Sequence, residues 1–180
     1  MSVSKGAVAA KLTREEIEKK AADILLAHNL YSIPVDLVAI ANRNGVGIYN
    51  AKFSEDNISA MLSKRGDNVT MLVNQSDYSN RKRFSIAHEL GHHFLHLFED
   101  GEIIDTEVDL FRFESNTLDA GNEKRLREIQ ANQFAAALLM PSELVRKYFH
   151  ETTSDLTALA QLFTVSEEAM GYRLNQLGLV

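Results

Sequence analysis

Three residues near the middle of the chain have the types and spacing of a metallopeptidase site. His88, Glu89 and His92 form the pattern H-E-x-x-H within residues 81–98. On a helix, residues four apart lie on one face, so both histidine rings can bind one Zn²⁺ ion. Glu89 points about 100° away, where it can take a proton from a water molecule at the open metal position. The pattern therefore predicts two zinc ligands and a general base.

The residues around this pattern favour a helix. Apolar side chains recur at helical spacing, and Ser79 or Asp77 could supply the N-cap. Gly91 lies inside the expected helix, where glycine costs roughly 1 kcal/mol relative to alanine at an exposed position. We interpret this glycine as a point at which another backbone or a metal approaches closely. The polar residues near the motif that could stabilise an oxyanion are Tyr78, Arg83 and His93.

A third zinc ligand must come from outside this helix. The chain has no cysteine, which leaves histidine and carboxylate as ligand types. His96 continues the helical spacing, but eight residues at 1.5 Å per residue place its Cα about 12 Å from that of His88, too far for one ion to bind both. That distance excludes His96 as a ligand together with His88, and we assign neither His93 nor His96 a role.

A second informative helix is predicted at residues 122–139, ending at Met140 and Pro141. One of its faces is apolar and rich in alanine, and Glu128 and Asn132 lie at the margin of that face. We select Glu128 as third ligand, and Asn132, one turn later, could hydrogen-bond a ligating ring. The other carboxylates that could serve as third ligand are Glu114, Asp119 and Glu123.

The first third of the chain predicts a scaffold of two helices and a small sheet. Thr13 and Glu16 form a capping box for the first helix, and Pro34 opens a second helix that stops at Gly45. The β-prone runs that follow are residues 46–53, 58–65 and 69–74. We predict a three-stranded antiparallel meander, and hence an α+β fold, with a sheet edge that could bind an extended peptide beside the metal.

Charge is distributed unevenly along the chain. The net charge is −6, and residues 99–121 carry eight acidic side chains and one basic side chain. Such a segment is commonly a solvated loop or hairpin. As an acidic wall beside the metal helix, it would favour a basic protein substrate and disfavour nucleic acid.

Three stretches together resemble the ImmA/IrrE family of bacterial and phage metallopeptidases. They are RFSIAHELGHHFLH at 83–96, EIQANQFAAALLMP at 128–141 and DLTALAQLFTVSEEAMGYRLNQLGL at 155–179. The resemblance covers roughly residues 30–180, and its second stretch is more specific than H-E-x-x-H alone. It implies a zincin-like fold in which one zinc ion is bound by His88, His92 and Glu128 and in which Glu89 is catalytic.

The resemblance also implies a function. Family members are zinc peptidases that cleave or inactivate helix-turn-helix repressors, often encoded beside them, and so switch on mobile-element, stress-response or toxin–antitoxin genes. We therefore predict a zinc-dependent endopeptidase that acts on a basic helix-turn-helix repressor. The alternative is a regulatory binding protein that acts on a repressor or on DNA without proteolysis.

The C-terminal tail has helix-turn-helix-like spacing, with Ser166 as N-cap of its second helix. Glu167 and Glu168 occupy the first turn of that helix, where DNA phosphates would lie. Arg173 is the only basic residue within 154–180, against three acidic residues. We therefore expect the tail to pack on the peptidase core or to bind a protein partner, and not to bind nucleic acid.

Length and composition suit one globular domain. The chain has 180 residues, of which 45% are hydrophobic, enough for a sizeable core. We divide it into a flexible N-terminus (1–12), a zincin-like peptidase domain (13–150) and a helical tail (151–180). No run approaches the ~18 apolar residues of a membrane span, and no signal-peptide core is visible, so we expect a cytoplasmic protein.

Overall fold

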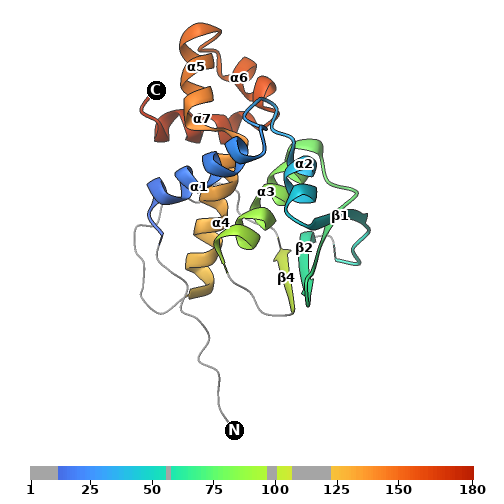
Figure 1. The fold of residues 1–180 in the computed structure, drawn as a ribbon. Helices are drawn as coiled ribbons and strands as arrows, with labels where there is room; N and C mark the ends of the chain where they lie inside the picture. Colours follow the sequence, from blue (N-terminus) through green and yellow to red (C-terminus); the bar gives the residue numbers. More distant parts are fainter. Residues whose placement is uncertain (1–11, 56–57, 97–100, 107–122) are drawn as a thin grey trace.

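A computed structural model of the chain describes residues 12–55, 58–96, 101–106 and 123–180. These residues form seven helices and a small sheet, arranged as an α+β fold (Figure 1). The elements are α1 (Arg14–Ala27), α2 (Leu37–Arg43), β1 (Val46–Ala51), β2 (Ile58–Arg65), β3 (Asn68–Asn74), α3 (Ser79–Leu95), β4 (Gly101–Thr106), α4 (Glu123–Leu139), α5 (Ser142–Glu151), α6 (Leu156–Phe163) and α7 (Glu167–Gln176). No helix within these ranges is long and apolar enough to cross a membrane.

The sheet has four strands in the order β1-β3-β2-β4. β1 pairs with β3 in parallel, and β2 lies antiparallel between β3 and β4. The predicted three-stranded antiparallel meander is therefore wrong, because β1 neighbours β3 and a fourth strand is present. The burial of the strands agrees with the place of β1 at an edge: of its six residues only Val46 is buried, whereas β2 and β3 have more buried positions.

The fourth strand comes from the acidic segment. Residues 101–106 form β4, an edge of the sheet, with the backbone of Ile104 opposite Met61 of β2. The other residues of the 99–121 segment lie outside the described part of the chain, so the acidic wall stays a prediction. The edges at which a peptide strand could add are consequently β1 and β4.

The predicted start of the first helix is confirmed, and the predicted start of the second helix is wrong. α1 has the predicted capping box, since the Thr13 side chain accepts from the Glu16 N–H and the Glu16 carboxylate accepts from the Thr13 N–H at 2.7 Å. α2 does not open at Pro34, which follows a cis peptide bond. The Asp36 carboxylate accepts a hydrogen bond from the Ala39 N–H at 2.9 Å, so this better N-cap starts the helix at Leu37, three residues later.

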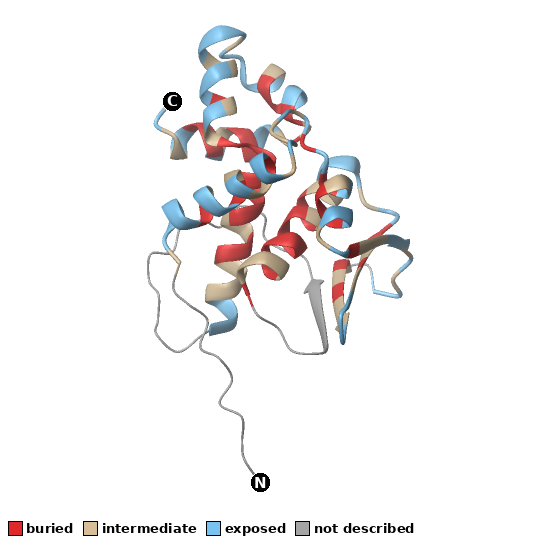
Figure 2. Ribbon diagram, viewed as in Figure 1, coloured by how far each residue is buried: buried red, intermediate tan, exposed pale blue. Residues whose placement is uncertain are grey.

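The core is centred on α3 and α4, which carry much of the buried ribbon in Figure 2. Their contacts run in antiparallel order, from His88 with Asn132 to His96 with Arg127. Their backbones come closest at Gly91 of α3. A Cβ atom at this position would lie 2.9 Å from the Cα and 3.0 Å from the carbonyl oxygen of Ala131. The interpretation that Gly91 admits another backbone is therefore confirmed. Neither Ser79 nor Asp77 caps α3, which starts after Tyr78 without a side-chain cap.

Replacing Gly91 by alanine should lower the free energy of unfolding by about 1–3 kcal/mol, because the added methyl group meets backbone atoms that cannot move aside. Urea unfolding with an unchanged m-value would measure this loss. Gly171, in α7, is the matched control, because a Cβ there meets only the Leu156 Cδ1 atom at 3.9 Å. Gly171→Ala should stabilise the protein by about 0.5–1 kcal/mol through helix propensity. Equal stability of the two variants would contradict close packing at Gly91.

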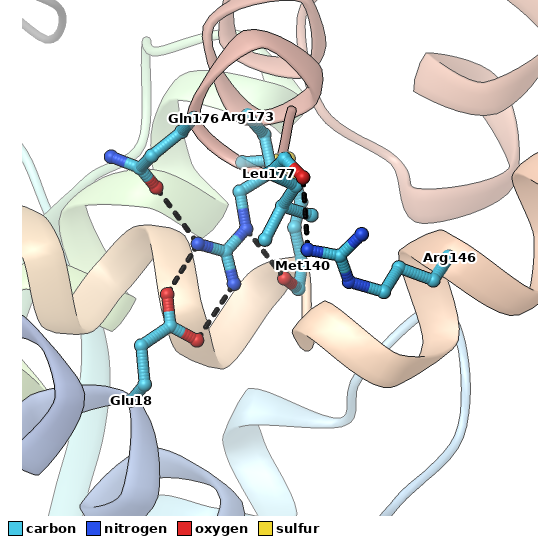
Figure 3. A network of polar contacts seen from close by, with 6 residues as sticks. All are labelled: Glu18, Met140, Arg146, Arg173, Gln176 and Leu177. Atoms are coloured by element: carbon cyan, nitrogen blue, oxygen red, sulfur yellow. Dashed lines mark hydrogen bonds and ion pairs between the residues drawn. The ribbon is translucent and has the colours of Figure 1, made fainter. Parts of the chain in front are cut away.

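Buried polar contacts join the tail to the rest of the fold. Arg173 of α7 is 2% exposed, and its Nε donates to the Met140 carbonyl oxygen at 2.9 Å (Figure 3). Its guanidinium also pairs with the Glu18 carboxylate of α1, with one contact at 2.8 Å. Ser166 is the N-cap of α7, as predicted. The one basic residue of 154–180 therefore points inward, where it cannot contact DNA phosphates.

Candidate metal centre

Three side chains from two helices meet between α3 and α4. The Nε2 atoms of His88 and His92 are 3.0 Å apart, and they lie 3.2 and 3.4 Å from Oε2 of Glu128. All the ligand atoms of this group lie within 4.8 Å of one another. The structure thus brings together the two histidines and the carboxylate that the sequence selected. Glu123 lies more than one turn earlier on α4, and the other two candidate carboxylates are outside the described residues.

The spacing of these atoms matches a tetrahedral zinc site. A tetrahedral ion with bonds of about 2.0–2.1 Å holds its ligand atoms about 3.3 Å apart, and the three atoms here are separated by 3.0, 3.2 and 3.4 Å. Two imidazole nitrogens and one carboxylate oxygen are also a common ligand set of open zinc sites, in which the fourth position is left for water or substrate. The residues present therefore fit a zinc ion.

Local helix geometry and one close helix contact create this arrangement. His88 and His92 are four residues apart, so their rings share the face of α3 that meets α4. The approach of Gly91 to Ala131 brings the facing turn of α4, which carries Glu128, within reach of both rings. A larger residue at position 91 would separate the helices and with them the two parts of the site.

A hydrogen bond to α4 orients the first histidine. Nδ1 of His88 lies 2.7 Å from Oδ1 of Asn132. Because an amide oxygen can only accept, Nδ1 carries the proton and donates it to Asn132. The Nε2 lone pair of His88 then faces His92 and Glu128, which is the tautomer that can bind a metal.

The protonation states of the group also suit a cation. Burial is the main cause that lowers the pKa of His92, and the hydrogen bond with Glu128 opposes it, so the ring stays neutral at neutral pH. Burial acts to raise the pKa of Glu128, but its close contacts with the rings of His88 and His92 outweigh burial and hold that pKa well below its usual range. Neutral imidazole and ionised carboxylate are the forms that bind metal ions.

Glu89 follows the first histidine on α3 and is fully buried. Because successive helical residues are rotated by about 100°, its carboxylate leaves the helix in a different direction from the ring of His88. Among the residues that the structure describes, the metal-binding group consists of the two histidines and Glu128 and does not include Glu89. This separation suits a role for Glu89 in proton transfer rather than in metal binding.

His96 makes a contact that sequence reasoning missed. It is the C-cap of α3, and its Nε2 atom lies 3.1 Å from the Arg127 carbonyl oxygen, to which it donates. Burial lowers the pKa of His96 to about 4, so the ring is neutral at pH 7. The bond ties the end of α3 to the turn of α4 that carries Glu128. In the sequence, the spacing of four residues between His92 and His96 was the signal that could have predicted this contact.

The polar residues considered for oxyanion stabilisation lie in other places. Arg83 donates through Nη2 to the Val35 carbonyl oxygen at 2.9 Å. Tyr78 is 87% exposed at the start of α3. His93 is half-buried, and its pKa is lowered mainly by burial and further by the nearby Lys64. None of the three belongs to the metal-binding group found among the described residues.

Comparisons with known proteins agree with the site and the fold. Residues 41–175 match the family model described as the IrrE N-terminal-like domain of peptidase family M78. A search among proteins of curated function finds no match. A solved structure, that of a Mycobacterium tuberculosis transcriptional regulator, is similar with a TM-score of 0.64 and 18% identity, over 89% of this chain and 46% of that one. At this identity the likeness is one of fold, and this chain spans about half the length of the regulator.

Proposed function

Because the chain belongs to the ImmA/IrrE family of peptidases, whose domain covers residues 41–175, we propose that it is a zinc-dependent endopeptidase. His88, His92 and Glu128 are the proposed ligands of one Zn²⁺ per chain, and Glu89 is the proposed catalytic residue. The observation that carries this proposal is the set of three ligand atoms at tetrahedral spacing between α3 and α4.

The proposed mechanism divides the work among five side chains and the zinc ion. Bound zinc supplies Lewis acidity toward the scissile carbonyl group and toward water. The Glu89 carboxylate accepts a proton from the attacking water and donates it to the nitrogen of the leaving amine. Asn132 keeps the ring of His88 in the required tautomer and orientation. His92 and Glu128 complete the ligand set in their neutral and ionised forms.

A basic helix-turn-helix repressor is the proposed substrate, and its cleavage would derepress mobile-element, stress-response or toxin–antitoxin genes. The acidic composition of residues 99–121 supports a basic partner. The similarity in fold to a transcriptional regulator supports a role in transcriptional control. The inward position of Arg173 argues against direct action on DNA through α7.

Incubation of the zinc-loaded protein with the purified product of a neighbouring helix-turn-helix gene tests the proposal. We expect one or a few new N-termini by mass spectrometry, lost with a chelator and restored by one equivalent of zinc. A heat-inactivated sample and an unrelated basic protein are the controls. A repressor that stays full length beside protein with one zinc per chain would contradict proteolysis of that substrate.

A further inference from the structure

A pocket of about 280 Å³ lies between the core and the tail, and its lining includes Phe84, one helical turn before His88 on α3. The first turns of α3, the last turns of α4 and the helix α7 enclose it. Its inner wall is apolar and includes Phe84, Leu139, Met140 and Ala169, all of which are buried. Tyr172 of α7 lines the same pocket and is 43% exposed, so the pocket has a side toward solvent.

Two residues that line the pocket lie one helical turn from residues of the metal centre, on the same two helices. On α3, Phe84 precedes His88 by four residues and so lies on the same face, one turn away. On α4, Ala136 follows Asn132 by the same four residues and lines the pocket. The rings of Phe84 and His88 are stacked, with centroids 6.2 Å apart. A group that enters the pocket therefore contacts a residue that touches a proposed zinc ligand.

We propose that this pocket binds a large apolar side chain of the peptide substrate, close to the scissile bond, and that α7 forms its specificity-determining wall. The inference rests on the proposed peptidase function. One helical turn is about 5.4 Å, less than the length of two extended residues at about 3.3 Å each, so the first or second residue beside the scissile bond can reach the pocket. The volume lies just below the range of about 300–1,000 Å³ for pockets that hold whole small molecules, which suits one large side chain.

The contacts of the tail explain how α7 is held at the pocket. Arg173 bonds to the Met140 carbonyl oxygen at the end of α4 and pairs with Glu18 of α1 (Figure 3). Arg173 lines the same pocket as Ala169 and Tyr172, so its bonds hold the wall of the pocket that α7 forms. The helix-turn-helix-like tail thus has a use other than reading DNA, because it completes the surface that selects the substrate.

Two zinc-chelating hydroxamates with the same scaffold test the inference without a known substrate. One carries a benzyl side chain and the other a methyl group, and calorimetry measures their binding to the zinc-loaded protein. We expect the benzyl compound to bind at least about tenfold more tightly, because it buries a large apolar group. Ala169→Phe should fill the pocket and abolish this preference while the methyl compound binds as before. Asn175→Phe, on the exposed side of α7, is the matched control and should keep the preference.

A second variant covers the case in which Ala169→Phe does not fold. Tyr172→Ala removes a partly exposed wall residue and should weaken the benzyl compound several-fold, with the melting temperature and zinc content unchanged. Equal affinities of the two compounds for the wild-type protein would overturn the pocket assignment and leave the zinc site intact. Binding of neither compound to a protein that also fails to retain zinc would overturn the proposed function and the pocket assignment together.

Discussion

Replacing Glu89 by glutamine should reduce peptide cleavage by about 10²–10⁴-fold and leave one zinc ion bound per chain. Glutamine has nearly the size of glutamate and can occupy the same buried position, but it cannot accept the proton of the attacking water. The three proposed ligands are untouched, so the metal content should not change. Initial rates from fragment quantification, together with elemental analysis of the same samples, measure both effects.

Glu123→Gln is the matched control, because Glu123 lies exposed in the first turn of α4. It should cleave at the wild-type rate. The same pair of variants separates proteolysis from binding without cleavage. A Glu89→Gln protein that still derepresses the target promoter to the wild-type level would contradict proteolysis and favour sequestration of the repressor.

Loss of a proposed ligand should cost the protein its zinc. His92→Ala or Glu128→Ala leaves two of three ligand atoms, and we expect zinc affinity to fall by more than about 100-fold. Asn132→Ala should cost only about 10–100-fold, because it removes the hydrogen bond that orients the ring of His88 and leaves every ligand in place. Competition with a chromophoric chelator gives the three affinities on one scale.

His93→Ala is the control for this series, since it removes a histidine from α3 that is outside the metal-binding group. Its zinc affinity should equal that of the unmodified chain. Stoichiometric zinc in Glu128→Ala would contradict the proposed third ligand and would shift the search to Glu114 and Asp119. A uniform loss of zinc and of secondary structure in every variant would instead show that the substitutions unfold the protein.

The sequence by itself determined the features that depend on neighbours within one or two helical turns. The spacing of His88 and His92 follows from the period of the helix, and their rings do meet. The capping box of Thr13 and the N-cap at Ser166 form between residues three apart and were likewise predictable. The residues of α4 that face the site were found by the same periodicity. Each of these features depends only on residues that are close in sequence, so the sequence is enough to predict it.

The start of two helices was predicted less well, because several nearby residues can compete to cap a helix. The Asp36 carboxylate accepts a hydrogen bond from the Ala39 N–H, and this cap, rather than Pro34, sets the first turn of α2. At α3 the carboxylate of Asp77 lies 3.4 Å from Nε of Arg81 and does not cap the helix. The contact of Asp77 with Arg81, rather than a cap, therefore accounts for the position of its side chain.

Only the tertiary structure decided how the elements are placed relative to one another. The order β1-β3-β2-β4 places β1 beside β3 and not beside β2, its neighbour in the chain, and turn residues do not encode this order. The inward direction of Arg173 depends on Glu18, which is 155 residues away in the chain. The pocket exists because α3, α4 and α7 converge. Each of these features is a long-range contact, and its energy comes from burial that local sequence patterns cannot specify.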